Sequence, residues 1–288
     1  MFVADKWTEY RILDASDGEK LEDWNGKTLI RPDPQVIWNS GKRHPMWERA
    51  DARYQRSAAG GGAWERHSLP DSWLLHYGDL TFQVKPMGFK HTGIFPEQAY
   101  NWDFCRDLIL RAGRQITVLN LFAYTGGATL ACAKGGASLC HVDAAKGMVA
   151  WAKENAALCG LQDAPIRYIV DDCKKFVERE IRRGRKYDAV IMDPPSYGRG
   201  PGGEIWKLEE AIYPLLELTA QLLSDDPLFV LVNSYTTGIS PSVMACLLDK
   251  TVRPRFGGHI IAEELGLPVE DALPLPCGGS AYWISDTI

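Results

Sequence analysis

The chain of 288 residues lacks any long apolar run, and none reaches the roughly 18–20 residues that a membrane-spanning helix needs. Its first ten residues carry charges where a secretory signal peptide would have an apolar segment. These two absences predict a protein that is neither secreted nor embedded in a membrane. We therefore expect the chain in the cytoplasm, with no membrane partner.

Paired cysteines and metal-binding patterns are also lacking. The seven cysteines are scattered and odd in number, and no two stand in C-x-x-C spacing. The six histidines form no H-x-x-x-H pattern, and His141 is expected in the core. These patterns argue against a disulfide framework and against a zinc site. We expect no metal and a reducing compartment.

An excess of positive charge is missing as well. The formal net charge is −5 and the pI is about 5.7. Proteins that coat nucleic acid without sequence preference are basic, so this composition argues against that class. Basic residues do gather locally, at 106–114, 179–186 and 253–255. Such runs are typical of solvated helix faces, although a positive stripe on an acidic protein is the alternative.

The first 70 residues differ in composition from the rest. They are rich in Trp, Pro, Gly and Arg, with turn signals at Asp17-Gly18, Asn25-Gly26 and residues 60–62. Short apolar runs at 28–31 and 36–38 predict strands of a small β-rich lobe over residues 1–70. Six tryptophans of this lobe either form a stacking platform for bases or pack in its core: Trp7, Trp24, Trp38, Trp47, Trp64 and Trp73.

Residues 71–288 are expected to form a second domain. Two β-prone runs joined by Gly78-Asp79 predict a hairpin over 73–85, and helical spacing follows over 96–111, with Pro96 in the first turn. Apolar runs then alternate with helical patterns. The runs read as buried strands at 117–122, 139–142, 166–170, 189–192 and 228–232, and the helices are expected at 127–134, 145–159, 172–183, 208–223 and 242–250.

This alternation predicts a doubly wound α/β fold. Two more strands, at 258–263 and 281–285, would close the sheet with a hairpin at the C-terminal end. We therefore expect a Rossmann-like seven-stranded sheet of the class I methyltransferase type. A dinucleotide dehydrogenase usually has six parallel strands instead.

Polar residues stand at the ends of the predicted strands, at Asn120, Asp143, Asp171-Asp172, Asp193 and Asn233. Ligands of open α/β sheets bind at the carboxyl ends of the strands, near the point where the strand order reverses. Asp and Asn are also common turn formers. So many polar strand ends in one sheet nevertheless indicate a binding site.

The turn after the first strand of this domain predicts a nucleotide-type ligand. Thr125-Gly126-Gly127 lets the backbone approach a ligand and opens a helix whose free N–H groups face an anion. The turn is not G-x-G-x-x-G, which weakens an NAD interpretation. Asp143 lies 16 residues after Gly127, where a carboxylate accepts both ribose hydroxyls. Its alternative role is the N-cap of the next helix.

The next two carboxylates divide between a ligand role and a capping role. Asp172 is placed to accept from an adenine amino group, and Asp171 to cap the following helix, although the reverse assignment is nearly as well supported.

D-P-P-S-Y at Asp193–Tyr197 is the most specific single motif for a catalytic loop. The double proline fixes an extended, rigid turn and leaves its carbonyls free to accept hydrogen bonds. Such a loop can hold an amino group or a ring nitrogen through Asp193, with Tyr197 as a flat residue that stacks on a base. With S-adenosylmethionine as an activated electrophile, holding the lone pair in line with its methyl group is most of the catalysis.

The motifs together resemble the large-subunit (23S) ribosomal RNA methyltransferase family, which includes 5-methylcytosine and 7-methylguanine enzymes. The similarity covers roughly residues 70–288. It rests on the order of N-L-F-A-Y-T-G-G-A, H-V-D, D-D-C-K-K-F and D-P-P-S-Y, with K-H-T-G-I-F-P-E-Q upstream at 90–98. The resemblance implies a class I fold, S-adenosylmethionine as cofactor and base methylation in ribosomal RNA. It also implies that the segment 95–98 lies over the cofactor.

Two sets of site residues follow from the motifs and the resemblance. The residues expected at the cofactor are Phe95, Gln98, Asn120, Phe122, Tyr124, Thr125, Gly126, Gly127, Asp143, Ala144, Asp171, Asp172, Cys173 and Asp193. The residues expected at the reacting group are Asp193, Pro194, Pro195, Tyr197 and Asn233.

The chain departs from the family in three places. The 5-methylcytosine members carry a nucleophilic cysteine after the fifth strand, where this chain has Asn233-Ser234-Tyr235. Only Cys277 would be left for that role, so methylation of a nitrogen is favoured over methylation of carbon. The arginine that usually follows Gln98 is missing, and the first 70 residues do not read as the PUA domain of that family.

Two other functions stay open on the sequence. The acceptor of the methyl group is alternatively a nitrogen of a protein or of a small molecule, because D-P-P-S-Y resembles amino-group sites in general. A S-adenosylmethionine-binding module without catalysis, acting in RNA handling, is the second alternative. The glycine-rich stretch 198–203 is either a mobile lid, with Arg199 as a phosphate contact, or a plain connector.

Overall fold

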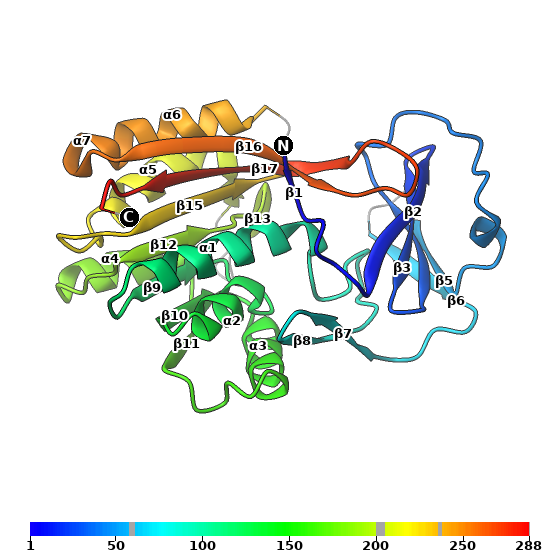
Figure 1. Ribbon diagram of the computed structural model, residues 1–288, viewed down its shortest axis with the longest axis horizontal. Coiled ribbons are helices and arrows are strands. Elements are labelled where there is room, and N and C mark those ends of the chain that lie inside the picture. Colours follow the sequence, from blue (N-terminus) through cyan, green and yellow to red (C-terminus); the bar gives the residue numbers. More distant parts are fainter. Residues whose placement is uncertain (58–60, 200–204, 236–237, 288) are drawn as a thin grey trace. The chain divides into compact units, whose positions relative to one another are not determined.

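The computed structural model describes residues 1–57, 61–199, 205–235 and 238–287 (Figure 1). The chain divides into two compact units. The small unit contains residues 3–100 and 266–277, and the large unit contains residues 1–2, 101–265 and 278–288. The sequence placed this division near residue 70, whereas the structure places residues 71–100 in the small unit.

Hydrogen bonds explain why the predicted hairpin belongs to the small unit. The hairpin consists of β7 (Trp73–Tyr77) and β8 (Leu80–Val84), as expected. The indole N–H of Trp73 donates to the carbonyl of Trp24 over 3.1 Å. The backbone N–H of His76 donates to the carboxylate of Glu9 over 2.7 Å. These contacts join the hairpin to the strands that precede it in the chain.

A five-stranded sheet forms the centre of the small unit, in the order β2-β3-β4-β5-β6. Its strands are β2 (Tyr10–Ser16), β3 (Glu19–Trp24), β4 (Thr28–Pro32), β5 (Ala52–Arg56) and β6 (Gly62–Arg66), with the 3₁₀ helix η1 (Pro45–Glu48) before β5. The expected strand at 28–31 is confirmed. The expected strand at 36–38 is wrong, because the carbonyls of Val36 and Trp38 accept from the turn at Gly18 and Asp17 instead of pairing with a strand.

The tryptophans of the small unit mainly serve its own packing. Trp24 is fully buried. Five others donate their indole N–H to acceptors within the unit: Trp7, Trp38, Trp47, Trp64 and Trp73. Because these indole N–H groups bond to acceptors inside the unit, packing in its core is favoured over a stacking platform for bases.

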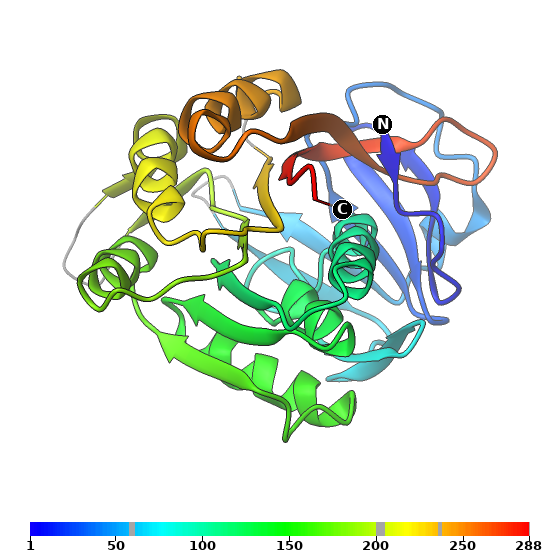
Figure 2. The same ribbon diagram turned by 60° about the vertical axis from the view of Figure 1, so that its left-hand side comes forward.

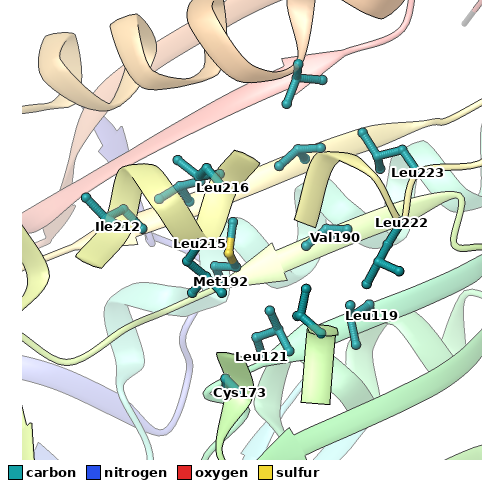
Figure 3. Close-up of a cluster of buried hydrophobic side chains, with 14 of the residues drawn as sticks. Leu119, Leu121, Cys173, Val190, Met192, Ile212, Leu215, Leu216, Leu222 and Leu223 are labelled. Carbon is teal, nitrogen blue, oxygen red and sulfur yellow. The ribbon is translucent and has the colours of Figure 1, made fainter. Parts of the chain in front are cut away.

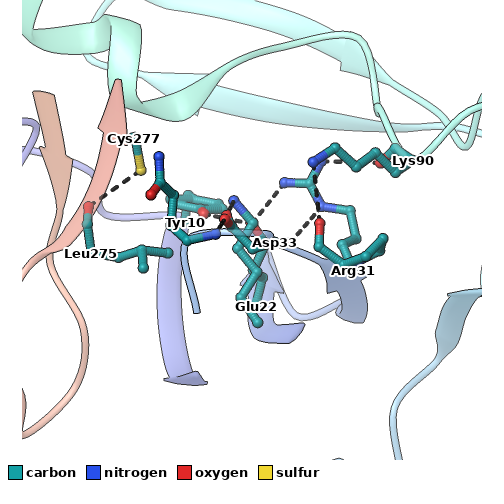
Figure 4. A network of polar contacts seen from close by, with 10 residues as sticks. Tyr10, Glu22, Arg31, Asp33, Lys90, Leu275 and Cys277 are labelled. Carbon is teal, nitrogen blue, oxygen red and sulfur yellow. Dashed lines mark hydrogen bonds and ion pairs between the residues drawn. The ribbon is translucent and has the colours of Figure 1, made fainter. Parts of the chain in front are cut away.

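Buried charges lie beside this aromatic core (Figure 4). The carboxylate of Glu22 accepts from the Arg31 guanidinium at 2.5 and 2.7 Å and from the hydroxyl of Tyr10 at 2.7 Å. Lys20 lies 3.5 Å from Glu22 and 3.3 Å from Asp33. Lys20, Glu22, Arg31 and Asp33 are all buried, and we call them the ion cluster.

An eight-stranded sheet forms the centre of the large unit, in the order β1-β16-β17-β15-β12-β9-β10-β11. Its strands are β9 (Thr117–Leu121), β10 (Ser138–Asp143), β11 (Ile166–Val170), β12 (Ala189–Met192), β15 (Phe229–Ser234), β16 (His259–Leu267), β17 (Leu275–Ile284) and the short β1 (Phe2–Val3). Strands β9 to β12 and β15 pair in parallel, and β17 runs antiparallel to β15. The seven expected strands and the class I sheet are confirmed; β1 is an additional strand.

Helices cover both faces of this sheet (Figures 1 and 2). They are α1 (Ala99–Arg111), α2 (Gly127–Lys134), α3 (Lys146–Leu158), α4 (Cys173–Arg182), α5 (Leu208–Ala220), α6 (Pro241–Thr251) and α7 (Arg253–Phe256). The 3₁₀ helix η2 (Pro96–Gln98), which belongs to the small unit, precedes α1 in the chain. The expected helices are present, and Pro96 opens the 3₁₀ turn before α1. The one-turn α7 was not expected from the sequence.

Alternate residues of the central strands supply two separate cores. Leu119 and Leu121 of β9 pack with α4, α5 and α6, in the cluster shown in Figure 3. Val118 packs on the opposite face with residues of α1 and α2. This period of two is the pleat of a strand buried on both sides, and it fixes which way Asn120 points. The side chain of Asn120 therefore faces α2.

The stretch expected as a lid lies partly outside the described residues. Its described flanks form a small hairpin of β13 (Tyr197–Arg199) and β14 (Ile205–Lys207), in which Tyr197 pairs with Lys207. Residues 200–204, which include most of the glycines of this stretch, are not among the described ones. No helix in the described part of the chain is both long enough and apolar enough to cross a membrane.

Candidate functional site

The polar strand ends expected at the site lie on neighbouring strands. β9 pairs with β10 on one side and with β12 on the other, and all three run in parallel. Their carboxyl ends therefore meet at one edge of the sheet, at Asn120, Asp143 and Asp193. The chain order reverses between β9 and β12, which is where open α/β sheets bind their ligands.

The turn after β9 has an unusual backbone. Phe122 and Tyr124 have positive φ of 56° and 49°, and Gly126 has a φ of 93°. Left-handed conformations of residues other than glycine cost free energy, of order 1–3 kcal/mol each, and persist where the surroundings impose them. Here the N–H of Ala123 donates to the carbonyl of Val142, and the N–H of Tyr124 donates to the Asp143 carboxylate at 2.9 Å.

Glycine is required at both positions that open α2. A Cβ on Gly126 would lie 3.1 Å from the Cβ of Ala152, on a residue whose φ is already left-handed. A Cβ on Gly127 would lie 2.6 Å from the indole ring of Trp102. No side chain caps α2, so the N–H groups of its first turn are left to another acceptor.

Buried side chains that the sequence did not point to hold this turn in place through hydrogen bonds. The amide of Asn155 in α3 donates to the carbonyl of Thr125 at 3.0 Å. Asn120 donates to the hydroxyl of Thr129 at 2.9 Å, and this hydroxyl lies 2.9 Å from Nδ1 of His141. Burial lowers the pKa of His141 to about 4, although the backbone of Tyr124 raises it, so the imidazole is neutral. The expectation that His141 is a core residue is confirmed.

Asp143 lies at the end of β10 with both carboxylate oxygens engaged. Oδ2 accepts from the N–H of Tyr124 and Oδ1 from the N–H of Ala145 at 2.8 Å. The N-cap of α3 is Ala145, so the alternative assignment of Asp143 as that N-cap is wrong. Burial raises the pKa of Asp143, and the two backbone hydrogen bonds oppose this rise. Each oxygen keeps a further lone pair for a ligand hydroxyl, and Ala144 beside it is exposed.

The structure gives the capping role after β11 to Asp172. Asp172 is the N-cap of α4, and its Oδ1 accepts from the N–H of Lys175 at 2.9 Å. The prediction that Asp171 is the cap is wrong, because the residue immediately before the helix is Asp172. Asp171 instead accepts from the N–H of Asp172 and forms an ion pair with Arg179.

Cys173 joins three elements beneath the glycine turn. Its thiol accepts from the N–H of Phe122 at 3.3 Å and lies 4.0 Å from the carbonyl of Val142, as a weak donor. Burial raises the pKa of the Cys173 thiol far above its usual range, and the bond from Phe122 offsets only part of this. Cys173 is therefore a neutral thiol that supports the strained turn from the start of α4.

The D-P-P-S-Y loop is fixed by a tryptophan that the motif does not contain. The indole N–H of Trp206 in β14 donates to the carbonyl of Pro195 at 2.6 Å. The ring of Trp206 lies 5.3 Å from the ring of Phe122. Trp206 thus connects the loop after β12 with the turn after β9. Within the loop, Pro194 is buried and Tyr197 is 53 % exposed, as a residue that stacks on a ligand would be.

Asn233 is less accessible than expected. Its side chain is buried, and its Oδ1 accepts from Asn101 at 3.0 Å and from the hydroxyl of Ser280 at 2.6 Å. Tyr282 donates to Asn101 and extends the network. The reason is the antiparallel pairing of β15 with β17, which sets Asn233 opposite Ser280. Its carbonyl oxygen therefore serves this buried network.

The remaining expected residues belong to the small unit and are described only within it. Phe95 precedes η2 as its N-cap residue, and Gln98 ends η2 and is buried. Cys277, the one cysteine considered as a nucleophile, is buried and donates to the carbonyl of Leu275 at 3.3 Å. Burial raises the pKa of Cys277 well above its usual range, so it is a thiol and not a nucleophilic thiolate.

Comparison with known proteins gives consistent matches. A sequence model described as S-adenosylmethionine-dependent methyltransferase matches residues 52–264. A crystal structure of a SAM-dependent methyltransferase from Agrobacterium tumefaciens is similar with a TM-score of 0.92 and 33% identity, over 98% of this chain and 92% of that one. A methyltransferase from Streptococcus mutans, with a TM-score of 0.72 and 20% identity over 97% of this chain and 76% of that one, shares the fold.

Curated relatives match a shorter part. A ribosomal RNA large subunit methyltransferase K/L from Shewanella baltica is 35% identical over 117 residues, which is 40% of this chain and 16% of the relative. The protein of the same name from Shewanella frigidimarina is 31% identical over 155 residues, 53% of this chain and 21% of the relative. The matched part of the chain thus spans about a fifth of the length of these relatives.

Proposed function

Because the chain belongs to the S-adenosylmethionine-dependent methyltransferase family, we propose that it transfers the cofactor's methyl group to a nitrogen of a base in ribosomal RNA. The observation that carries the proposal is the meeting of the glycine turn, Asp143 and the Asp193 loop at one sheet edge. The names of the Shewanella relatives support RNA as the substrate class.

The residues at this edge fit S-adenosylmethionine. The uncapped N-terminus of α2 beside Gly126 suits the methionine carboxylate. Asp143, held rigidly by two backbone N–H groups, would accept from the ribose hydroxyls. Asp172 would accept from the adenine amino group, since its capping bond uses only Oδ1. Phe95 and Gln98 stay expectations from the family resemblance.

Bound S-adenosylmethionine supplies a methyl group on a sulfonium, which is already activated for attack. The protein's own task is then to present a nitrogen lone pair and to exclude water. We assign the orientation of the acceptor N–H groups to Asp193 and to the loop carbonyls, and the stacking of the base to Tyr197. A base taken from a paired region would first leave its stack, which favours single-stranded or structured loops of RNA.

A nitrogen acceptor is favoured over a carbon acceptor because carbon methylation of a pyrimidine uses a thiolate nucleophile. Asn233 and Ser234 end β15 and Tyr235 follows it, where such a cysteine would stand. Burial keeps both Cys173 and Cys277 as neutral thiols. A ring nitrogen or an exocyclic amine needs no covalent activation, only orientation.

The substitution Asp193→Asn tests the assigned site. The amide keeps the shape of the side chain but removes its negative charge and replaces one acceptor oxygen with a donor, so the N–H of the methyl acceptor loses its charged partner. We expect methyl transfer to ribosomal RNA to fall by about 100-fold or more, as for a lost charged hydrogen bond in a transition state. Calorimetric affinity for S-adenosylmethionine should stay close to that of the wild type.

Two results would change the proposal. Unaltered turnover by Asp193→Asn would remove this residue from the site. Methyl transfer to protein alone, or cofactor binding without transfer to any acceptor, would select the protein-modifying enzyme or the non-catalytic binding module instead.

A further inference from the structure

An exposed phenylalanine, Phe89, lies in a hydrogen-bonded loop of the small unit. The loop extends the β7–β8 hairpin, because the N–H of Lys85 donates to the carbonyl of Thr92 and the N–H of Met87 to the carbonyl of His91. The indole N–H of Trp64 donates to the carbonyls of Met87 and Phe89, at 2.9 and 3.1 Å. We call residues 87–91 the tip loop.

The side chain of Phe89 is 63% exposed although its backbone is held by these bonds. A large apolar side chain fixed on the outside is therefore a candidate contact for a partner. An aromatic ring held this way costs little conformational entropy on binding, since only the side-chain rotamer is left to order.

A cation lies on the same sheet face as Trp64. Tyr54 of β5 pairs with Trp64 of β6, and their rings meet edge to face at 5.5 Å. Arg56 is two residues beyond Tyr54 and so points to the same face. It is exposed, and no carboxylate of the described residues forms an ion pair with it. Arg56 is thus free to meet an anion beside the tip loop.

Burial and neighbouring charges shift the pKa of two groups of the tip loop. Burial lowers the pKa of Lys90, and the charges of Lys20, Arg31 and Arg56 lower it further, against Asp33. Burial lowers the pKa of His91 to about 4, with Arg31, Lys90 and Lys20 acting in the same direction. Lys20 and Arg31 are paired with Glu22 and Asp33 in the ion cluster, so the cations available to an anion at this surface are Arg56 and Lys90.

We propose that the tip loop and the adjoining end of β5 bind a single-stranded segment of the RNA substrate, with a base stacked on Phe89 and phosphates held by Arg56 and Lys90. An aromatic face beside cations is the usual combination for single-stranded nucleic acid. A protein partner with an acidic surface would use the cations but has no need of the flat exposed ring. The inference rests on the proposed function, because it presumes that RNA is the substrate.

The test compares RNA binding by Phe89→Ala and Arg56→Gln with that of the wild-type chain. The probe is a fluorescein-labelled, unstructured RNA oligonucleotide, followed by fluorescence anisotropy at several salt concentrations. Phe89→Ala should weaken binding by about 10-fold, the usual size of one lost base–aromatic stack. Arg56→Gln should weaken binding and reduce the salt dependence by about one phosphate contact.

Matched controls come from the same unit. Leu273→Ala removes an apolar side chain that is 87% exposed. Arg11→Gln removes a charge from β2 on the opposite sheet face, since its neighbour Tyr10 points to the ion cluster. Both controls should bind RNA like the wild type. In steady-state assays, Phe89→Ala should raise the KM for RNA and leave kcat and the KM for S-adenosylmethionine unchanged.

The outcomes separate this inference from the proposed function. If the wild type binds and methylates RNA and both variants match it, the tip loop is not an RNA contact, and the proposed function stands. Equal losses in the variants and in both controls would also overturn the inference, because the effect would then be general. If the wild type neither binds nor methylates RNA, the proposed function fails and this surface loses its assigned partner.

Discussion

Asp143 shows how much one residue does at the proposed site. Its carboxylate supports the strained backbone of Tyr124 and keeps lone pairs that we propose accept from the ribose of the cofactor. The substitution Asp143→Ala should weaken the binding of S-adenosylmethionine by about 100-fold or more, since two hydrogen bonds to a charged group are lost. Isothermal titration calorimetry measures this directly. Asp163→Ala, at an exposed carboxylate after α3, is the matched control.

The same carboxylate predicts a pH dependence. Burial raises the pKa of Asp143, so its charged form is lost at a higher pH than the ordinary value of about 3.9. Affinity for the cofactor should fall as the pH falls through this raised pKa. An Asp143→Asn variant should bind weakly with no such dependence, and an unchanged pH profile in that variant would remove Asp143 from the ribose site.

Glu22 in the ion cluster governs the stability of the small unit (Figure 4). Burial alone raises the pKa of Glu22, but the charges of Arg31 and Lys20 and the hydrogen bonds from Arg31 and Tyr10 lower it to about 2. A lowered carboxyl pKa stabilises the folded state above the unfolded pKa of about 4.3. This stabilisation is lost as the pH falls from there towards about 2.

The substitution Glu22→Gln should therefore lower the free energy of unfolding at neutral pH by about 3–5 kcal/mol, because it leaves Arg31 buried without its carboxylate. Urea unfolding followed by tryptophan fluorescence reports on it through the buried Trp24. Glu65→Gln, at an exposed carboxylate of β6, should change stability by no more than about 1 kcal/mol. Similar values for both variants would show that the ion cluster adds nothing.

At the scale of elements, the turn between β9 and α2 has strict backbone requirements, because Phe122, Tyr124 and Gly126 all have positive φ. Gly126→Ala would force a Cβ into a left-handed residue, 3.1 Å from Ala152. We expect a loss of about 1–3 kcal/mol in stability and a weaker affinity for S-adenosylmethionine. Thermal melts with and without cofactor measure both effects.

Gly147→Ala is the matched control for this prediction. Gly147 lies inside α3 with no atom within 4 Å of a Cβ added there. Alanine should stabilise this helix by about 0.5–1 kcal/mol and leave cofactor binding unchanged. If Gly126→Ala behaved like Gly147→Ala, the turn would not need its left-handed glycine.

Elements with strong periodicity were predictable from the sequence, and short ones were not. The strands β9, β10 and β12 stand out because both of their faces are buried and most of their residues are apolar. Residues 36–38 are apolar too, yet their carbonyls are used by a neighbouring turn, which no local pattern reveals. The hairpin β13–β14 lies beside a glycine-rich stretch whose composition is typical of a connector.

The candidate site was predictable where a motif carries its own geometry. Gly126, Asp143 and Asp193 follow strands, so parallel pairing alone brings them together. Asn155, Trp102 and Trp206 support the same site from helices and strands far along the chain. Their contacts depend on tertiary packing and leave no local signal. For the same reason the burial of Asn233 opposite Ser280 was not foreseen.

At the scale of the whole molecule, the division into units follows hydrogen bonding rather than composition. The change of composition near residue 70 is real, but Trp73 and His76 bond back to residues 24 and 9. The small unit also takes residues 266–277 from the far end of the chain. The proposed function assigns cofactor chemistry to the large unit, and the further inference assigns RNA contact to the small one.

Methyl transfer to RNA is the central claim, and one measurement tests it most directly. Purified protein is incubated with tritium-labelled S-adenosylmethionine and with total RNA or total protein from cells deleted for the gene. We predict label in large-subunit ribosomal RNA, on an N-methylated nucleoside after digestion, and none with Asp193→Asn. Label in the protein fraction alone, or on the C5 carbon of a pyrimidine, would contradict the account.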